Sequence, residues 1–134
     1  LGEARARYTA SAIAGTVMML SDDYEREEAK ERSRILTGNP EVNKVAASRV
    51  AFRPTEAGGT SASHCFTAVI AGKQYIAMFS CETGEQIVEL DSLRAGLKTG
   101  VSYRELWSGK TVQEKDGRIS WNIKDCDAAL FKEE

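Results

Sequence analysis

The chain has 134 residues, of which 42% are hydrophobic and 28% are charged. This length suits one domain with a single hydrophobic core, and the composition excludes an intrinsically disordered chain. The formal net charge of −2 argues against binding of nucleic acid or of a membrane surface, because both need a clustered basic excess. The apolar runs are far shorter than the roughly 20 residues that span a bilayer, so we expect no membrane segment. Because the sequence opens at Leu1 inside a helix-forming stretch, we expect a piece of a larger protein.

Three cysteines, Cys65, Cys81 and Cys126, are scattered through the second half of the chain. They are too few for a disulfide framework, and a zinc site lacks both a CxxC pair and a second histidine. We therefore predict no metal site and no cofactor, with the thiols reduced and packed as small hydrophobic groups. One alternative stays open, because a hairpin around Gly72 could place Cys65 opposite Cys81, in a strand register that the sequence leaves undetermined.

The first part of the chain is predicted to be helical, with one short strand. Residues 4–13 are rich in alanine and favour a helix, which Gly15 ends. Residues 16–20 (Thr-Val-Met-Met-Leu) form a continuous apolar run, typical of a strand buried on both faces in a parallel sheet. A single parallel strand cannot bury both of its faces, so this strand needs neighbouring strands that the chain does not contain.

Ser21, Asp22 and Asp23 follow this run, and their short oxygen-bearing side chains suit the N-cap of the next helix. That helix is predicted over residues 24–36, with a charged and solvated outer face. Pro40 then opens a short helix that continues to residue 45.

From residue 53 onward the pattern changes to alternating residues and turns. Residues 54–61 are the most linker-like stretch of the chain. Short strand candidates follow at 64–70, 74–80, 85–90, 101–106, 117–123 and 128–132. Regularly spaced short strands without an amphipathic helix among them predict an antiparallel, Greek-key-like β-sandwich. The fold class is therefore α+β, and we expect two units, residues 1–56 and residues 57–134.

Four groups of motifs stand in order along the chain: AIAGTVMMLSDD (12–23); ILTGNPEVNKV (35–45) leading into AFRP (51–54); YIAMFS (75–80); and YRELWSGK (103–110), followed by GRISW (117–121) and DAALF (127–131). In this order they resemble the carboxy-terminal part of α-galactosidase-type glycoside hydrolases, the clan of families 27, 31 and 36. The resemblance implies that the first motif is the last strand of a catalytic (β/α)8 or TIM barrel, with the Asp that follows it. The later motifs then resemble strands of the C-terminal β-domain, with Glu105 in place of the usual Asp.

The resemblance implies that the parent protein hydrolyses terminal α-linked sugars with retention, using one aspartate as nucleophile and another as acid/base. In the family these aspartates follow the fourth and sixth barrel strands, whereas this chain holds only the region of the eighth. No residue here is therefore assigned a catalytic role. The expected partner is the catalytic barrel of the parent, through which the protein meets its carbohydrate substrate.

Ser21, Asp22 and Asp23 are the candidate substrate-binding residues, because loops at the C-terminal ends of barrel strands lie on the active-site face. Helix capping is the competing interpretation of the same side chains. His64, the only histidine, is expected at a strand edge with its ring hydrogen bonded.

Trp107 and Trp121 have two interpretations, as packed core residues or as a platform that stacks on sugar rings. We expect packing, with Trp107 against the sandwich or the end of the barrel and on the same side of its strand as Tyr103 and Glu105. The alternative function is a carbohydrate-binding β-sandwich module without hydrolase activity. A structural or protein-interaction domain is a third interpretation.

Overall fold

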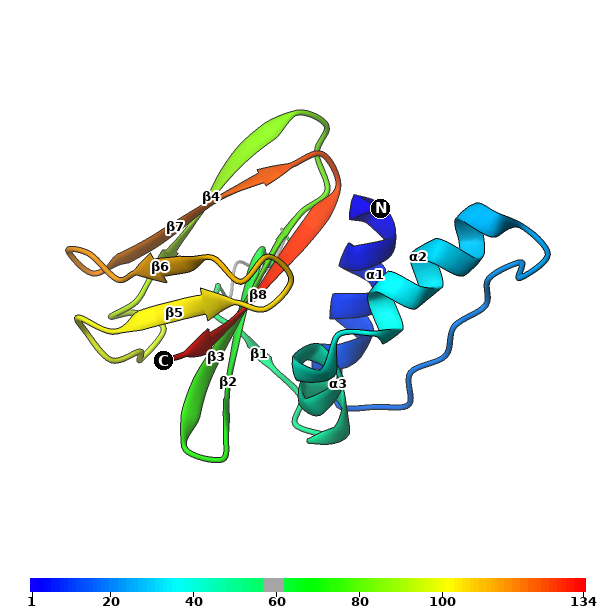
Figure 1. Cartoon of the computed structure of the whole chain (residues 1–134). Helices are drawn as coiled ribbons and strands as arrows, with labels where there is room; N and C mark the ends of the chain where they lie inside the picture. Colours follow the sequence, from blue (N-terminus) through cyan, green and yellow to red (C-terminus); the bar gives the residue numbers. More distant parts are fainter. Residues whose placement is uncertain (57–61) are drawn as a thin grey trace.

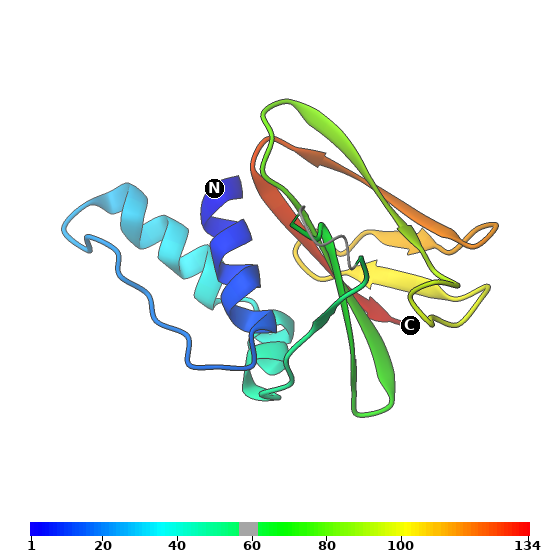
Figure 2. The ribbon, with the colours of Figure 1, turned by 180° about the vertical axis from the view of Figure 1, so that it is seen from behind.

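The computed structural model of the chain describes residues 1–56 and 62–134, and it has three layers (Figure 1). Three helices, α1 (Gly2–Ile13), α2 (Glu27–Thr37) and α3 (Pro40–Ala47), lie on one side of a six-stranded sheet. A two-stranded sheet lies on the other side, as the reverse view also shows (Figure 2). Among the described residues, no helix has the length and apolar character needed to cross a membrane.

The two sheets are antiparallel throughout, which confirms the predicted α+β class and β-sandwich. The larger sheet has the order β1-β2-β3-β8-β5-β6, and the smaller sheet pairs β4 with β7. The strand bounds are β1 (Arg53–Pro54), β2 (Cys65–Ile70), β3 (Lys73–Ser80), β4 (Glu85–Asp91), β5 (Ser102–Glu105), β6 (Thr111–Gln113), β7 (Arg118–Lys124) and β8 (Asp127–Glu133). The chain crosses between the sheets after β3, β4, β6 and β7, and these crossings bring together strands that are distant in sequence.

β3 contributes to both cores, because successive side chains of a strand point to opposite faces. Tyr75 and Ala77 pack against the helices, in a cluster with Ile13, Leu36 and Leu130. The alternate residues of β3, Ile76 and Met78, pack between the two sheets. The cluster that they form there also includes Cys65, Val88, Leu90, Tyr103, Ile119, Ile123 and Phe131. The six-stranded sheet is thus buried on both faces along its middle.

The β2–β3 hairpin is confirmed, with its turn one residue earlier than expected. Ile70 pairs with Lys73, so Ala71 and Gly72 form a two-residue turn. Both have positive φ, 49° and 77°, the combination that a type I′ turn requires. This register places Cys65 opposite Met78, and the possible Cys65–Cys81 pairing is therefore wrong.

The three helices confirm the predicted ones, with different caps for α2. Its N-cap is Arg26, whose side chain makes no capping hydrogen bond, so the capping role expected of Ser21, Asp22 and Asp23 is wrong. The reason is that the chain makes a further turn before the helix begins, in which Arg26 N–H donates to the carbonyl of Asp23 (3.1 Å). α3 follows the prediction, because Pro40 occupies its first position behind a capping asparagine.

Residues 16–20 do not form the predicted strand. They are extended, but in the described part of the chain no strand pairs with them. A strand needs a neighbour to satisfy its backbone donors and acceptors, and the sheet of this chain lies on the far side of the helices (Figure 1). Part of the predicted linker does contribute to the sheet, since Arg53 and Pro54 pair with β2. Residues 57–61 of that linker lie outside the described residues.

Candidate functional site

A groove of about 440 Å³ lies between α1, α2 and residues 16–20, which are called the extended segment below. Its apolar lining includes Ala4, Met18 and Leu36, and its charged lining consists of Glu3, Arg7, Asp22 and Arg32. The hydroxyl of Tyr8, which also lines the groove, donates to Oδ1 of Asn43 (2.7 Å). Burial raises the pKa of this phenol, so it remains a neutral hydrogen-bond donor at physiological pH.

The structure brings two of the three candidate substrate-binding residues to this groove. Ser21 and Asp22 line it, whereas the carboxylate of Asp23 accepts the amide N–H of Glu25 (3.1 Å). Nη2 of Arg32 donates to Oδ1 of Asp22 (2.7 Å), with the aspartate side chain 18% exposed. The other acid of the groove, Glu3, is ion-paired with Arg7 one turn away.

The two carboxylates that line the groove are therefore each neutralised by an arginine. A retaining glycosidase needs one free carboxylate to attack and one carboxylic acid to protonate the leaving oxygen. The groove does not supply this arrangement, and its Asp22–Arg32 ion pair instead joins the end of the extended segment to α2.

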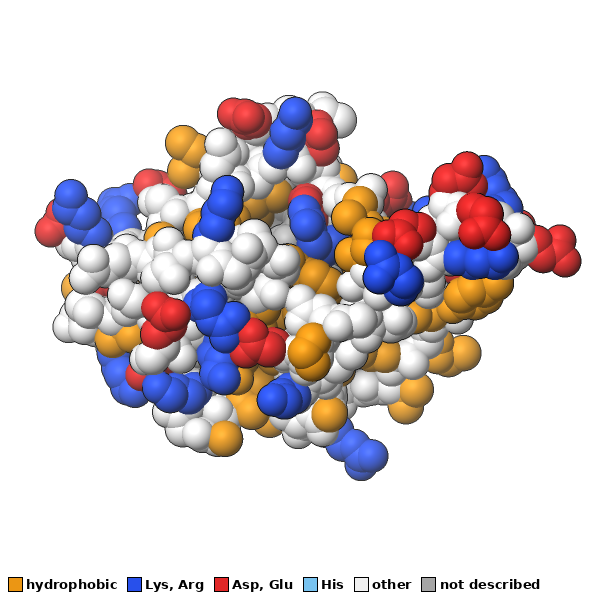
Figure 3. All heavy atoms as spheres, viewed as in Figure 1, with side chains coloured by type: hydrophobic (Ala, Val, Ile, Leu, Met, Phe, Trp, Pro, Cys, Tyr) orange, Lys and Arg blue, Asp and Glu red, His pale blue; other side chains and the backbone are white. Residues whose placement is uncertain are grey.

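The extended segment has one side toward the helices and one side toward solvent. Met18 packs against the core of the helical layer. Its neighbours Val17 and Met19 are 83% and 86% exposed, and Met19 also lines the groove. Figure 3 shows hydrophobic side chains along this segment, below the charged surface of α2. Successive side chains of this segment thus point to opposite sides, and the side chains on both sides are apolar. This pattern is typical of a strand that packs on a helical layer with one face and on apolar neighbours with the other.

Trp107 packs where the helical layer meets the larger sheet. Its indole Nε1 donates to Oγ1 of Thr9 in α1 (3.0 Å), and its ring makes an edge contact with Tyr8 (5.9 Å between centroids). Its predicted side relative to Tyr103 is wrong, because β5 ends at Glu105 and a turn follows, in which Gly109 N–H donates to the Glu105 carbonyl (2.8 Å). Tyr103 lies between the sheets, whereas Trp107 faces α1.

Glu105 organises this turn from a buried position, 3% exposed. Its carboxylate accepts the backbone N–H groups of Trp107 (3.1 Å), Ser108 (2.6 Å) and Leu130 (3.2 Å). An acidic residue at this point of the motif therefore has a structural role in holding the turn against β8.

The remaining ring candidates also take part in packing or backbone contacts. Trp121 packs edge-on against Phe131 of the inter-sheet core, with 5.0 Å between the ring centroids. Nδ1 of His64 lies 3.3 Å from the carbonyl oxygen of Phe79, at the start of β2. These positions agree with the packing interpretation of the tryptophans and with a hydrogen-bonded histidine at a strand edge.

Two ion pairs that tie the helices to the sheet were not predicted from the sequence. Arg5 of α1 forms a bidentate pair with Asp127 at the start of β8. Arg104 of β5 donates from Nη1 and Nη2 to the carboxylate of Glu41 in α3 (2.6 and 2.7 Å). This arginine lowers the pKa of Glu41. The partners are far apart in sequence, and no local pattern indicates such pairs.

Comparison of the sequence with models of protein families and with curated proteins finds no match. Comparison of the structure with solved structures finds an α-galactosidase of Mortierella vinacea, with a TM-score of 0.79 at 15% identity. The fold is that of a segment of α-galactosidases. The match covers 98% of this chain and 35% of the α-galactosidase. This agrees with the order of the sequence motifs, which resembles one part of such an enzyme.

The α-galactosidase segment recurs in enzymes of other substrate classes. The isomaltodextranase of Arthrobacter globiformis matches with a TM-score of 0.78 at 19% identity, over 98% of this chain and 23% of that enzyme. The β-L-arabinopyranosidase of Geobacillus stearothermophilus matches with a TM-score of 0.78 at 19% identity, over 97% of this chain and 29% of that enzyme. The chain thus spans about a quarter to a third of the solved structures that it matches, and its fold does not select one sugar.

Proposed function

We propose that this chain is the C-terminal portion of a retaining glycosidase of α-galactosidase type, which acts on terminal α-linked sugars. In this proposal the chain is not catalytic by itself, and it packs against and stabilises the catalytic barrel. The outward apolar row of the extended segment carries the proposal. Val17 and Met19 are more than four-fifths exposed, although burial of an apolar side chain of this size is worth about 1.5–3 kcal/mol.

An adjacent barrel strand on each side would pair the backbone of residues 16–20, and the barrel interior would cover Val17 and Met19. Helices α1 and α2, which pack on the Met18 side, are then the outer helices before and after this strand. The segments that match the three glycosidases above support this assignment, since each is a fraction of a larger enzyme.

Under this proposal Ser21, Asp22 and Asp23 lie at the C-terminal end of the last barrel strand, on the substrate face. We propose that they form part of the substrate loop, with Asp22 held in place by Arg32. Asp22→Asn in the whole enzyme is expected to raise KM more than it lowers kcat, because the nucleophile and the acid lie elsewhere.

A matched pair of substitutions tests the docking of the extended segment. Met19→Ser is expected to leave the urea midpoint of the isolated chain unchanged and to lower that of the whole enzyme clearly. Met18→Ser is expected to lower both midpoints, because Met18 packs against the chain's own core. An equal and negligible effect of Met19→Ser in both proteins would refute the proposed barrel contact.

The isolated chain is also expected to release no p-nitrophenol from p-nitrophenyl α-galactoside, because both catalytic carboxylates lie outside it. Turnover that disappears in the double variant Asp22→Asn, Asp23→Asn would contradict this assignment. Galactoside binding by the isolated chain, measured by calorimetry, would favour the carbohydrate-binding module instead.

A further inference from the structure

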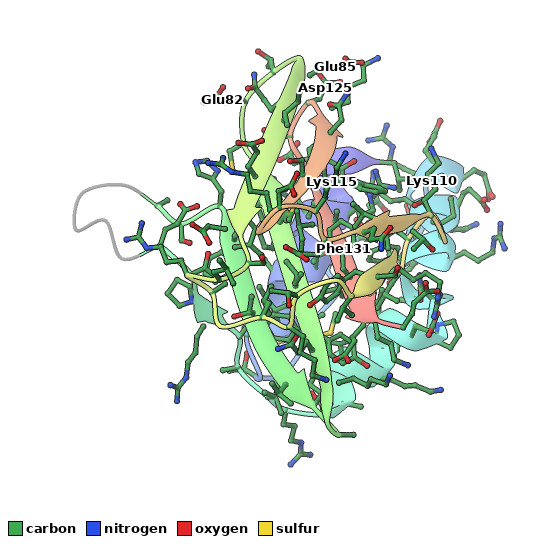
Figure 4. All side chains as sticks on the ribbon, turned by 90° about the vertical axis from the view of Figure 1, so that its left-hand side faces the viewer. Glu82, Glu85, Lys110, Lys115, Asp125 and Phe131 are labelled. Carbon is green, nitrogen blue, oxygen red and sulfur yellow. The ribbon has the colours of Figure 1, made fainter. Side chains whose placement is uncertain are left out.

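Two connections between the sheets run side by side at one end of the sandwich. Residues 81–84 lead from β3 to β4, and residues 125 and 126 lead from β7 to β8. Asp125 N–H donates to the carbonyl of Gly84 (2.7 Å), and Gly84 N–H donates to Oδ1 of Asp125 (3.0 Å). Figure 4 shows Glu82, Glu85 and Asp125 together at this end. The two crossings are therefore held against each other by one backbone hydrogen bond and one hydrogen bond to the Asp125 carboxylate.

Each crossing begins or ends with a cysteine, and the strand register brings the two cysteines together. Ser80 pairs with Asp127 at the end of the β3–β8 ladder. Continuing the same register by one residue places Cys81 opposite Cys126. Paired Cα atoms of antiparallel strands lie about 4.5–5.5 Å apart, inside the range that a disulfide spans.

Both cysteines lie on the helical side of the sheet. Phe79 packs on that side, and the carbonyl oxygen of Cys126 lies 2.9 Å from the position that a Cβ at Gly2, the first residue of α1, would take. Cys81 lines a shallow apolar groove on that side with Ile13 and Phe79.

We propose that Cys81 and Cys126 form a reversible disulfide that joins the two crossings covalently. The third cysteine, Cys65, is fully buried between the sheets and opposite Met78, so it has no part in the exchange. The oxidant is a small-molecule disulfide such as glutathione disulfide. This inference does not depend on the proposed glycosidase function.

The exchange proceeds in two balanced steps. The thiolate of Cys81, which is exposed, attacks one sulfur of glutathione disulfide, and one glutathione thiolate leaves and takes up a proton. The thiolate of Cys126 then attacks the Cys81 sulfur of the mixed disulfide, and the second glutathione leaves. Two protein thiols and one glutathione disulfide thus give one protein disulfide and two glutathione molecules. Burial and the neighbouring Cys81 raise the pKa of Cys126 and so lower its thiolate fraction, which disfavours Cys126 as the first thiol to attack.

The disulfide closes a loop from residue 81 to residue 126, which contains β4, β5, β6 and β7. It therefore restricts the unfolded chain and prevents the two-stranded sheet from separating from the larger sheet at this end. Reduction leaves the same fold, with the two crossings joined only by the hydrogen bonds between Gly84 and Asp125. The melting temperature of the chain consequently depends on the redox state of its surroundings.

The test equilibrates the chain with reduced or oxidised glutathione and then labels free thiols with N-ethylmaleimide in denaturant. We expect three adducts on the reduced chain and one on the oxidised chain. Tryptic digestion of the oxidised chain is expected to link the peptide of residues 74–94 to that of residues 125–132. Three adducts after oxidation, or a peptide linked through Cys65, would overturn the proposal.

Matched variants separate the disulfide from a general effect of oxidation. Oxidation is expected to raise the melting temperature of the chain by about 5 °C or more. Cys126→Ser is expected to lose this rise and to retain one glutathione on Cys81, whereas Cys65→Ala is expected to keep both the rise and the linked peptides. An equal rise in Cys126→Ser would show that another group is oxidised and would refute the assignment.

Discussion

Trp107 joins the helical layer to the larger sheet by two different contacts, and two different substitutions of Trp107 distinguish their contributions to stability. Truncation to alanine removes the ring that packs on Tyr8 and also the N–H that donates to Thr9. Thr9 is fully buried, so its hydroxyl loses this partner in a place that water does not reach. Replacement by phenylalanine keeps an aromatic ring beside Tyr8 and removes only the hydrogen bond.

The magnitudes follow from burial. Truncation of a fully buried aromatic residue to alanine costs about 3–5 kcal/mol, and Trp107 is partly buried, so we expect about 3 kcal/mol for Trp107→Ala. For Trp107→Phe we expect about 1–2 kcal/mol, the cost of a buried hydroxyl that loses its partner. Thr9→Val combined with Trp107→Phe is expected to cost less than the sum of the single changes, because no polar group then remains unpaired.

The assay is urea denaturation, followed by circular dichroism, of five proteins: the unchanged chain, Trp107→Ala, Trp107→Phe, Thr9→Val and the double variant Thr9→Val, Trp107→Phe. Galactoside binding is measured on the same samples. The packing role would be refuted if Trp107→Ala changed the free energy of unfolding by less than about 0.5 kcal/mol and also abolished galactoside binding. That outcome would instead make Trp107 part of a sugar-stacking platform. Strict additivity of Trp107→Phe and Thr9→Val would refute the energetic importance of their hydrogen bond.

Two further predictions concern the attachment of the helices. Arg104 lowers the pKa of Glu41 below its usual 4.5, so the ion pair contributes fully to the free energy of unfolding above that pH and loses this contribution as the pH falls through the lowered value. Glu41→Gln should therefore flatten the acid limb of the curve of stability against pH, measured by urea titration, and an unchanged limb would contradict the assignment. Residues 57–134 alone should melt cooperatively, at a lower temperature than the whole chain, and residues 1–56 alone should not; a folded, monomeric fragment of residues 1–56 would contradict the proposed division.

Much of the fold could be predicted because local chemistry determines it. The alternation of β2 and β3 around Gly72 indicated the hairpin, and its left-handed turn residues agree with that pattern. Pro40 indicated the start of α3 for an equally local reason. β6 was not predicted, because its three residues become a strand only by pairing with β5.

The candidate site was less predictable, because its geometry depends on long-range contacts. Ser21 and Asp22 reach the groove, whereas Asp23 turns toward the start of α2, and adjacent residues of one type give no signal of this difference. The side of Trp107 was misassigned because alternation applies only within a strand, and β5 ends at Glu105. The apolar run at 16–20 was predicted to be a strand, but in the described part of the chain no other strand pairs with it, so the strand does not form.

The contact between α1 and β8 joins the beginning of this sequence to its end. During synthesis, α1 leaves the ribosome before any strand of the sheets, yet the surface that it covers is completed only when residues 127–133 have emerged. β8 lies between β3 and β5 in the middle of the larger sheet, so without it neither sheet face can close. A premature stop codon before residue 127 would therefore leave α1 and the centre of the sheet without partners and expose the nascent chain to proteolysis.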